Sequence, residues 1–269
     1  MNELALFAGA GGGILGGHLL GWRTVCAVER DAYAAQVLAA RQNDRTLRPF
    51  PIWSDVCSFD GRPWRGIVDV VSGGFPCQDI SAAGAGAGID GERSGLWRQM
   101  ARIIGEVRPG GIYLENSPLL VGRGLAMVLG DLAEMGYDAR WGVVGAHHLS
   151  APHERERIWV VADADGFTWD QGRPDHATQR TRGGHAYRGS ISAHVRHTDR
   201  PRLAQRQSQP ADHGTQQPPA IRASRWPAEP GMGRVADGVA HRVDRITALG
   251  NGQVPRVAAA AFHLLSSRI

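Results

Sequence analysis

The sequence predicts an α/β protein built on a doubly wound, mostly parallel sheet. Over residues 1–164, short apolar segments of strand length alternate with longer segments of helical pattern, an order typical of successive β-α-β units. Several of the strand-like segments end in glycine or in polar residues, and α/β sheets bind ligands at the carboxyl ends of their strands. We therefore expect a Rossmann-like domain with its chemistry along one edge of the sheet.

The expected elements follow one another closely. An apolar strand over residues 4–8 leads into a glycine-rich turn and a helix that ends near residue 20. After it we expect a strand at 24–28, a helix at 32–41, a strand ending at 54–56 and a buried strand at 67–71. The pattern continues with helix 96–107, strand 111–114, helix 119–135, and strands 139–145 and 158–162. A last helix covers 254–267, with Pro255 in its first turn, where proline is tolerated.

The composition changes abruptly after Ala164. Residues 165–234 contain only six Val, Ile, Leu, Met or Phe residues, too few for an independent core. Eleven arginines against six acidic residues give this stretch a charge of +5, compared with +4 for the whole chain. One interpretation is a loosely folded insertion, and the other is a basic arm that lies against nucleic acid. The same segment could be both. We divide the chain at 1–164, 165–234 and 235–269.

Several classes of protein are excluded by what the 269 residues contain. There is no lysine, so a Walker A loop and a Schiff-base lysine are both ruled out. The three cysteines form no CxxC pair, which leaves no support for a disulfide framework or a zinc ribbon. Histidines at 176, 185, 194 and 197 lack the tight spacing of a metal site, and we expect no metal. No signal peptide or membrane span is predicted, so we expect a cytoplasmic protein.

The segment Gly73–Ser81, GGFPCQDIS, carries the main candidate for a nucleophile. Two glycines end the apolar run before it, and Pro76 fixes the backbone just before Cys77. This places a cysteine at the carboxyl end of a strand, where α/β sheets hold their reactive groups. An isolated cysteine in a turn is more often a packing residue, so the rest of the chain has to decide.

A glycine-rich turn with two acidic residues beyond it indicates a nucleoside site. The turn FAGAGGGILGG begins at Phe7, and Glu29 ends the second strand, where an acid can accept both ribose hydroxyls. Asp55, after the third strand, could contact an adenine amino group. The glycines also match GxGxxG, but in a chain with 36 glycines such a match is weak evidence for a dinucleotide.

Glu115 and Asn116 end another strand and should emerge on the same edge as Cys77. A carboxylate would raise the pKa of a neighbouring thiol, so its use must lie with the substrate. With a pyrimidine base, a thiolate could attack C6 while the carboxyl group protonates N3. Arg155 and Arg157, at strand spacing, could hold a phosphate or the base carbonyl.

Taken together, these segments resemble the DNA (cytosine-5) methyltransferase family, in particular its compact bacterial and phage members. The family's motifs FxGxGG, PCQ, ENV, QxRxR and GNxV, with an acid after the second strand, resemble segments of this chain in the same order. The matching segments are Phe7–Gly12, Glu29, Pro76–Gln78, Glu115–Ser117, His153–Arg157 and Gly250–Val254.

The resemblance implies a cofactor, S-adenosylmethionine, and a substrate, a cytosine flipped out of double-stranded DNA. The residues expected to bind the cofactor are Phe7, Ala8, Gly9, Gly11, Gly12, Glu29, Asp55, Val56, Asn251 and Val254. Cys77 would be the nucleophile and Glu115 the partner of N3, with Arg157 near the cytosine carbonyl and Arg155 near the DNA backbone. The other residues expected to bind the substrate are Pro76, Gln78, Ser81, Arg93 and Asn116.

The resemblance also assigns the remaining segments. The stretch from Ser81 to Trp97 corresponds to a mobile active-site loop, residues 165–234 to the target-recognition region, and 235–269 to a segment that returns to the catalytic domain beside the first helix. We expect a monomer in a bacterium or a phage-infected cell. Whether a cognate restriction endonuclease accompanies it, and which sequence it methylates, stay open.

This chain departs from the family pattern at three positions. Ala5 replaces a frequent acid, which could weaken cofactor binding, His153 replaces glutamine and Ser117 replaces valine. Three other functions stay open at this stage. The same chemistry on a tRNA cytosine would use nearly identical motifs, a nicotinamide-dependent oxidoreductase would leave Cys77 and Glu115 unexplained, and a non-catalytic DNA-binding relative would not need them.

Overall fold

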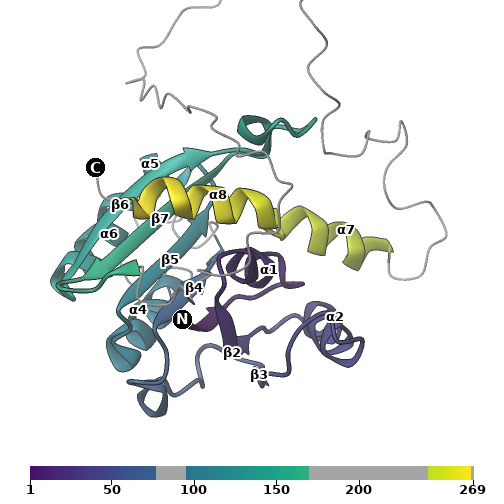
Figure 1. Ribbon diagram of the computed structural model, residues 1–269, viewed down its shortest axis with the longest axis horizontal. Helices are drawn as coiled ribbons and strands as arrows, with labels where there is room; N and C mark the ends of the chain where they lie inside the picture. Colours follow the sequence, from purple (N-terminus) through teal and green to yellow (C-terminus); the bar gives the residue numbers. More distant parts are fainter. Residues whose placement is uncertain (77–94, 170–241, 268–269) are drawn as a thin grey trace, which may run out of the picture. The chain divides into compact units, whose positions relative to one another are not determined.

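A seven-stranded sheet forms the centre of the described protein, with helices on both faces (Figure 1). The computed structural model describes residues 1–76, 95–169 and 242–267, and all of them belong to one compact unit. The strand order is β3-β2-β1-β4-β5-β7-β6. This is the α/β class predicted from the alternating pattern, and the sheet is mostly parallel as expected.

The strands are short and mostly buried. Their bounds are β1 Asn2–Leu6, β2 Arg23–Val28, β3 Ile52–Trp53, β4 Val70–Gly73, β5 Gly111–Asn116, β6 Tyr137–Val144 and β7 Arg157–Ala164. The first five run parallel to one another. The carboxyl ends of β1, β4 and β5, which are adjacent in the sheet, therefore meet at one edge.

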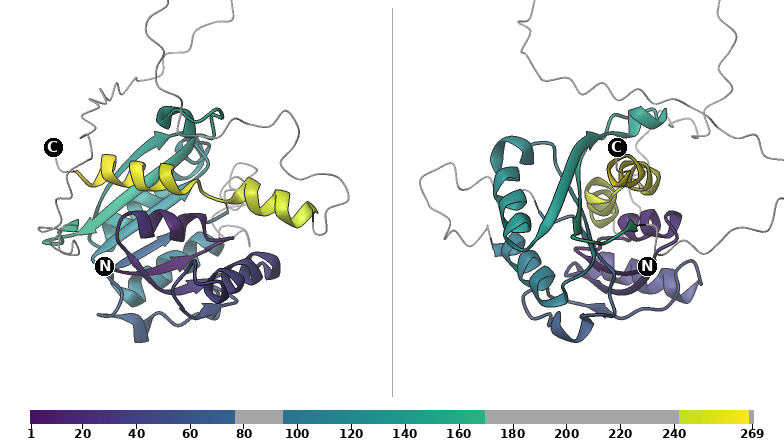
Figure 2. Two further views of the ribbon diagram at one scale, coloured as in Figure 1. Left: turned by 45° about the vertical axis from the view of Figure 1, so that its right-hand side comes forward. Right: turned by 60° about the vertical axis from the view of Figure 1, so that its left-hand side comes forward.

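The helices form a layer on each side of the sheet, as the right-hand view of Figure 2 shows. Their bounds are α1 Gly12–Leu19, α2 Ala32–Asn43, α4 Gly95–Val107, α5 Leu120–Arg123, α6 Leu125–Glu134, α7 Arg242–Asn251 and α8 Pro255–Ser266, with short 3₁₀ turns at Arg62–Trp64 and Ala146–Leu149. Helices α4 and α6 cover one face, and α1 and α8 cover the other.

Local chemistry explains several of these helices. The buried residues of α4 recur at helical spacing, with Trp97, Met100, Ile104 and Val107 against the sheet. Asp31 caps α2 because its side chain accepts a hydrogen bond from the Ala34 N–H at 2.8 Å.

Helix α8 packs directly on α1, as expected from the sequence. A Cβ on Gly16 of α1 would lie 2.8 Å from the Cβ of Ala258, so only glycine allows this approach. The close contact between α1 and α8 attaches the C-terminal helix to the first helix, which follows β1.

Three features of the fold differ from the pattern read from the sequence. Strand β7 is antiparallel to both β5 and β6, and the link from β6 to β7 contains only a 3₁₀ turn and no crossover helix. The helix expected at 119–135 is two helices, broken at Gly124, whose ψ of 0° lies outside the helical range. Helix α7 was not predicted, and its apolar residues Val243, Ile246 and Leu249 are exposed.

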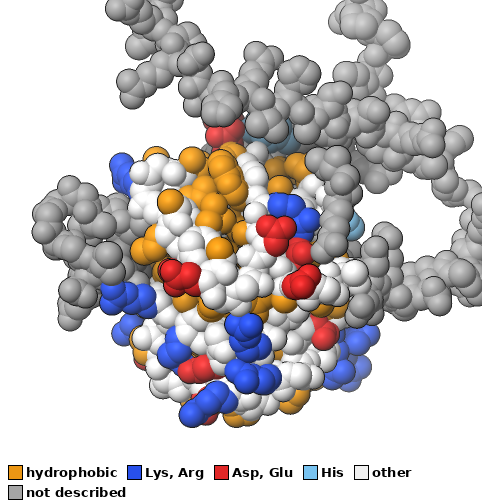
Figure 3. Space-filling model, turned by 90° about the vertical axis from the view of Figure 1, so that its left-hand side faces the viewer, with side chains coloured by type: hydrophobic (Ala, Val, Ile, Leu, Met, Phe, Trp, Pro, Cys, Tyr) orange, Lys and Arg blue, Asp and Glu red, His pale blue; other side chains and the backbone are white. Residues whose placement is uncertain are grey.

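Strand β6 forms one edge of the sheet, and hydrophobic side chains gather on the face of the molecule at this edge (Figure 3). Trp141 and Val143 of β6 are 43% and 38% exposed. Among the described residues, no helix is both long enough and apolar enough to cross a membrane.

Candidate active site

A cleft opens at the carboxyl ends of β1, β4 and β5, the edge where the sequence placed its reactive residues. Its empty space is about 540 Å³, a value that includes space open to solvent. The predicted site residues that line it are Phe7, Ala8, Gly9, Glu115 and Asn251. Three separate parts of the chain, the turn after β1, the end of β5 and the turn before α8, therefore meet here.

The turn after β1 has the backbone shape that a close ligand requires. Gly9 and Gly11 have φ angles of 54° and 90°, in the left-handed region that favours glycine. A Cβ added to Gly9 would meet no atom within 4 Å, so open space adjoins the backbone there. Gly11 is the N-cap of α1, and its carbonyl accepts from the Leu15 N–H at 3.0 Å.

Glu29 stands at the end of β2 and fixes this turn. Its Oε2 accepts from the Gly9 N–H at 2.6 Å, and its Oε1 accepts from the Asp31 N–H at 2.7 Å. The carboxylate therefore joins the glycine turn to the start of α2. Both oxygens keep further lone pairs that could accept from ribose hydroxyls.

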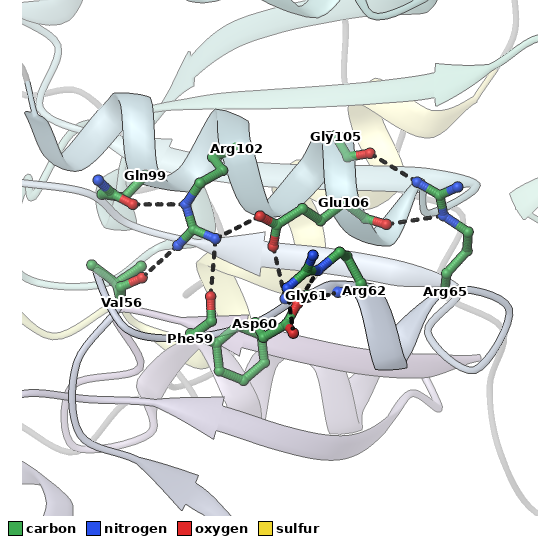
Figure 4. A network of polar contacts seen from close by, with 10 residues as sticks. All are labelled: Val56, Phe59, Asp60, Gly61, Arg62, Arg65, Gln99, Arg102, Gly105 and Glu106. Carbon is green, nitrogen blue, oxygen red and sulfur yellow. Dashed lines mark hydrogen bonds and ion pairs between the residues drawn. The ribbon is translucent and has the colours of Figure 1, made fainter.

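A network centred on Arg102 of α4 holds the turn that carries Asp55 and Val56 (Figure 4). The guanidinium donates to the carbonyls of Val56 at 2.9 Å and Phe59 at 3.0 Å, and it pairs with Glu106 at 2.8 Å. Asp55 itself accepts from the Cys57 N–H at 2.8 Å, and this bond is the main reason that its pKa lies below the usual value. Sequence reasoning missed Arg102, because a single arginine on a helix gives no motif.

Glu115, the last but one residue of β5, is the buried carboxyl group of the cleft. Its side chain is 10% exposed, and Oε1 lies 2.9 Å from Nε of Arg157. Gln253 Nε2 donates to Oε2 at 3.4 Å. Burial raises the pKa of Glu115 above its ordinary value, while Arg157, Gln253 and Arg155 act in the opposite direction. A raised pKa suits a carboxyl group that delivers a proton near neutral pH.

Asn116 anchors the loop that leads to Cys77. Its Nδ2 donates to the Phe75 carbonyl at 2.8 Å, and its Oδ1 accepts from the Ser117 N–H at 2.8 Å. A Cβ on Gly74 would lie 2.6 Å from Oε2 of Glu115, so glycine is required where this loop passes the carboxylate. The end of β4 is thereby held against the end of β5, with Pro76 exposed.

The two arginines predicted to share one side have different surroundings. Arg157 begins β7 and pairs with Glu115. Arg155 precedes the strand, with a φ of 38°, and its guanidinium donates to the carbonyls of Leu249 and Gly250 at 3.1 and 2.9 Å and to that of Gly252. Within the described chain, Arg155 thus fastens the end of α7 to the site. Its predicted contact with the DNA backbone stays a prediction.

Several predicted residues lie outside the described part of the chain. They are Cys77, Gln78, Ser81 and Arg93, with the mobile loop assigned to them, the four histidines weighed as a metal site, and the target-recognition region from residue 170 onward. Among the described residues, no cluster of three or more His, Cys, Asp or Glu side chains could hold a metal ion. Val254 is described and is the N-cap of α8.

The cleft contains three side chains that the motifs did not indicate. Glu3, Ser72 and Gln253 all line it. The first two belong to β1 and β4 but lie just outside the apolar runs 4–8 and 67–71 that predicted these strands. Gln253 is one of two residues between Asn251 and Val254, where the motif GNxV has one. Their arrangement depends on the order of the strands in the sheet, and no local sequence pattern predicts that order.

The donor set and the space at the turn fit S-adenosylmethionine. Gly9 leaves room beside its backbone, Glu29 offers carboxylate oxygens to a ribose, and the Val56 turn stands at the end of the adjacent strand β3. The first N–H groups of α1 point out of its N-terminus, the end of a helix that attracts negative charge. These features match a ligand with an adenosine and an amino-acid carboxylate.

Relatives of known activity share much of this chain. The Type II methyltransferase M.Eco47II of Escherichia coli is 34% identical over 176 residues, which are 62% of this chain and 41% of that protein. The Type II methyltransferase M2.BsuMI of Bacillus subtilis is 32% identical over 189 residues, 65% of this chain and 46% of that protein. The matched segment thus covers less than half of either relative.

Solved structures agree in fold. The chain matches the Dnmt2 methyltransferase of S. pombe with a TM-score of 0.52 at 18% identity, covering 61% of this chain and 51% of that one. It matches the methyltransferase EhMeth of Entamoeba histolytica with a TM-score of 0.51 at 17% identity, covering 61% and 52%. The model of the C-5 cytosine-specific DNA methylase family matches residues 1–213. With this match and the site geometry together, the chain belongs to the C-5 cytosine-specific DNA methylase family.

Proposed function

We propose that this protein is a DNA (cytosine-5) methyltransferase that uses S-adenosylmethionine and forms a covalent bond between Cys77 and C6 of a flipped cytosine. The observation that carries the proposal is the buried carboxyl group of Glu115 at the end of β5, beside the loop that leads into Cys77. Family membership supports the same chemistry.

The steps assign one task to each group. The Cys77 thiolate would attack C6 and form the S–C6 bond, while N3 takes the proton of Glu115. The electrons released from the C5–C6 double bond would make C5 nucleophilic, so that C5 takes a methyl group from a sulfonium as the methyl–sulfur bond breaks and its electron pair stays on sulfur. Loss of the C5 proton to solvent then restores the double bond and expels the thiolate, and N3 returns its proton to Glu115.

The chain's own residues prepare these steps. Arg157 holds one oxygen of Glu115 and would approach the cytosine carbonyl, and Asn116 fixes the loop before the nucleophile. S-adenosylmethionine, when bound, supplies the methyl group as a sulfonium. The residues that would hold it are those of the glycine turn, Glu29 and the Val56 turn.

The partner and the domain roles complete the proposal. Double-stranded DNA is the substrate, residues 165–234 act as the target-recognition region, and residues 235–269 complete the catalytic domain. The excess of arginine in 165–234 supports contacts with phosphates. Because two relatives are Type II methyltransferases, a cognate restriction endonuclease is part of the proposal.

Methyl transfer should be measured with labelled S-adenosylmethionine on duplex DNA and on tRNA side by side. We expect labelling of cytosine C5 in duplex DNA, and Cys77→Ser should abolish both labelling and covalent trapping on 5-fluorocytosine DNA. Labelling of tRNA alone would show that double-stranded DNA is not the substrate. Full activity of Cys77→Ser would show that the mechanism is wrong.

Cys26 provides the matched control. Its thiol is 2% exposed on β2, and burial raises its pKa to about 11, so it is a poor nucleophile. Cys26→Ala should therefore retain activity and trapping. Sequencing of methylated cytosines in DNA from cells that express the protein would then give the target sequence.

A further inference from the structure

Gln253 lies in the turn between α7 and α8, and it reaches into the gap between the two loops that form the cleft. A Cβ on Gly12 would overlap its carbonyl oxygen, and a Cβ on Gly13 would lie 2.7 Å from its Oε1. On the other side, a Cβ on Gly74 would lie 3.3 Å from its Nε2. The carboxamide therefore lies against the first turn of α1 through its oxygen and against the loop after β4 through its nitrogen.

The same carboxamide is one of two donors to the Glu115 carboxylate. Arg157 donates to Oε1 of the carboxylate and Gln253 donates to Oε2, so each oxygen has its own partner. The two donors differ in charge. Arginine favours the ionised carboxylate strongly, whereas a neutral amide orients the oxygen and holds the charge less firmly.

We infer that Gln253 is a positioning residue that orients the Glu115 carboxyl group and ties it to the cofactor-binding turn. The inference rests on the proposed function, in which Glu115 gives a proton to N3. A second arginine at this position would hold Glu115 ionised, and an apolar side chain would leave a buried oxygen without a donor. A neutral donor avoids both outcomes.

The other charged or titratable groups that face Glu115 are known. They are Arg157 at the start of β7, Arg155 before that strand, and Tyr113, which precedes Glu115 by two residues on β5. All three are retained in the Gln253 variants. In Gln253→Leu, which brings no new charge, a change in the titration of Glu115 can therefore be assigned to the lost amide.

The test compares Gln253→Leu and Gln253→Glu with the wild type. Leucine fills a similar volume without a donor, and glutamate keeps the shape but brings a like charge. The titration of the Glu115 carboxyl carbon, followed by ¹³C NMR and assigned with Glu115→Gln, requires no activity. The pKa of Glu115 should rise by about half a unit in Gln253→Leu and further in Gln253→Glu.

Kinetics gives the second readout. Activity that needs the protonated carboxyl falls as pH rises through its pKa, so the alkaline limb of kcat should move to higher pH in both variants. We expect kcat of Gln253→Leu to fall about fivefold below the limb, as for one lost hydrogen bond, with the KM for S-adenosylmethionine within about twofold. Gln36→Leu, on the exposed side of α2, is the matched control and should behave as wild type.

The outcomes separate the two proposals. If the Glu115 pKa and the pH profile are unchanged in both folded variants, the role of Gln253 is refuted. If the wild type transfers no methyl group but the NMR shift is present, the proposed function fails and the contact between Gln253 and Glu115 stands. Should Gln253→Leu not fold, the isosteric Gln253→Glu decides by the same two measurements.

Discussion

Glu3 is a buried acid in the middle of β1, and its titration makes the stability of the protein depend on pH. It is 1% exposed, and its two oxygens accept hydrogen bonds from Ser72 at 2.6 Å and Thr24 at 2.7 Å. Burial nevertheless dominates and raises the pKa of Glu3 from 4.5 to about 7. The folded protein therefore holds this proton more tightly than the unfolded chain does.

The sign and size of the effect follow from these two values. Below pH 4.5 the group is protonated in both states, and the stability is fully present. As pH rises through about 7, the buried group ionises and stability is lost. The two pKa values differ by about 2.5 pH units, so the total loss is about 3.4 kcal/mol. Between pH 5 and pH 8 the expected loss is about 2.5 kcal/mol.

Glu3→Gln should remove this dependence. The amide is neutral at all these pH values, and the two hydroxyls can rotate to donate to its oxygen and accept from its nitrogen. The free energy of unfolding from urea titrations at pH 5, 6, 7 and 8 is the measurement. The variant should be more stable than the wild type by about 3 kcal/mol at pH 8 and close to it at pH 5.

Glu134→Gln is the matched control, because Glu134 is exposed on α6. It should leave the pH dependence of the wild type intact. The reasoning about Glu3 is refuted if the difference between wild type and Glu3→Gln is the same at pH 5 and pH 8. It is also refuted if the variant is less stable at pH 8.

Two further predictions concern the site. Gly74→Ala should lower kcat about 100-fold with little change in circular dichroism, because the added Cβ would displace the Glu115 carboxylate. Gly130→Ala, where a Cβ meets no atom within 4 Å, is the control. Equal kcat values for the two variants would contradict the prediction. Arg102→Met should raise the Kd for S-adenosylmethionine about tenfold in calorimetry, because the Val56 and Phe59 carbonyls lose their donor. An unchanged Kd, equal to that of the exposed control Arg123→Met, would rule out this role.

The strand ends were predictable because their signals are local. Glycines after an apolar run mark the turn at Phe7, and Glu29 and Glu115 directly follow or end strands. A parallel sheet brings all such positions to one edge whatever the order of its strands. The class of fold and several of the residues that line the cleft could therefore be predicted before any contact was known.

The partners of those residues could not be inferred in this way. Gln253 and Glu115 are 138 positions apart, and Arg155 reaches Leu249 across 94. Such pairs exist only because α8 packs on α1 and β7 pairs with β5. The hydrophobic contacts that bring them together are non-directional, so the sequence around either residue says nothing about the other.

The sequence by itself determined the α/β class, the family resemblance and the chemical type of each candidate group, because residue identity and strand-end position are local properties. The tertiary structure decided the ionisation of the acids and the tasks of the arginines. In the sequence Glu3 is an ordinary acidic residue, but in the fold it is buried among three strands. Arg155 would be an exposed cation in an isolated segment, but in the fold its guanidinium donates to carbonyls at the end of α7. Desolvation and pairing depend on the whole packed surroundings of a group, and only the folded chain supplies them.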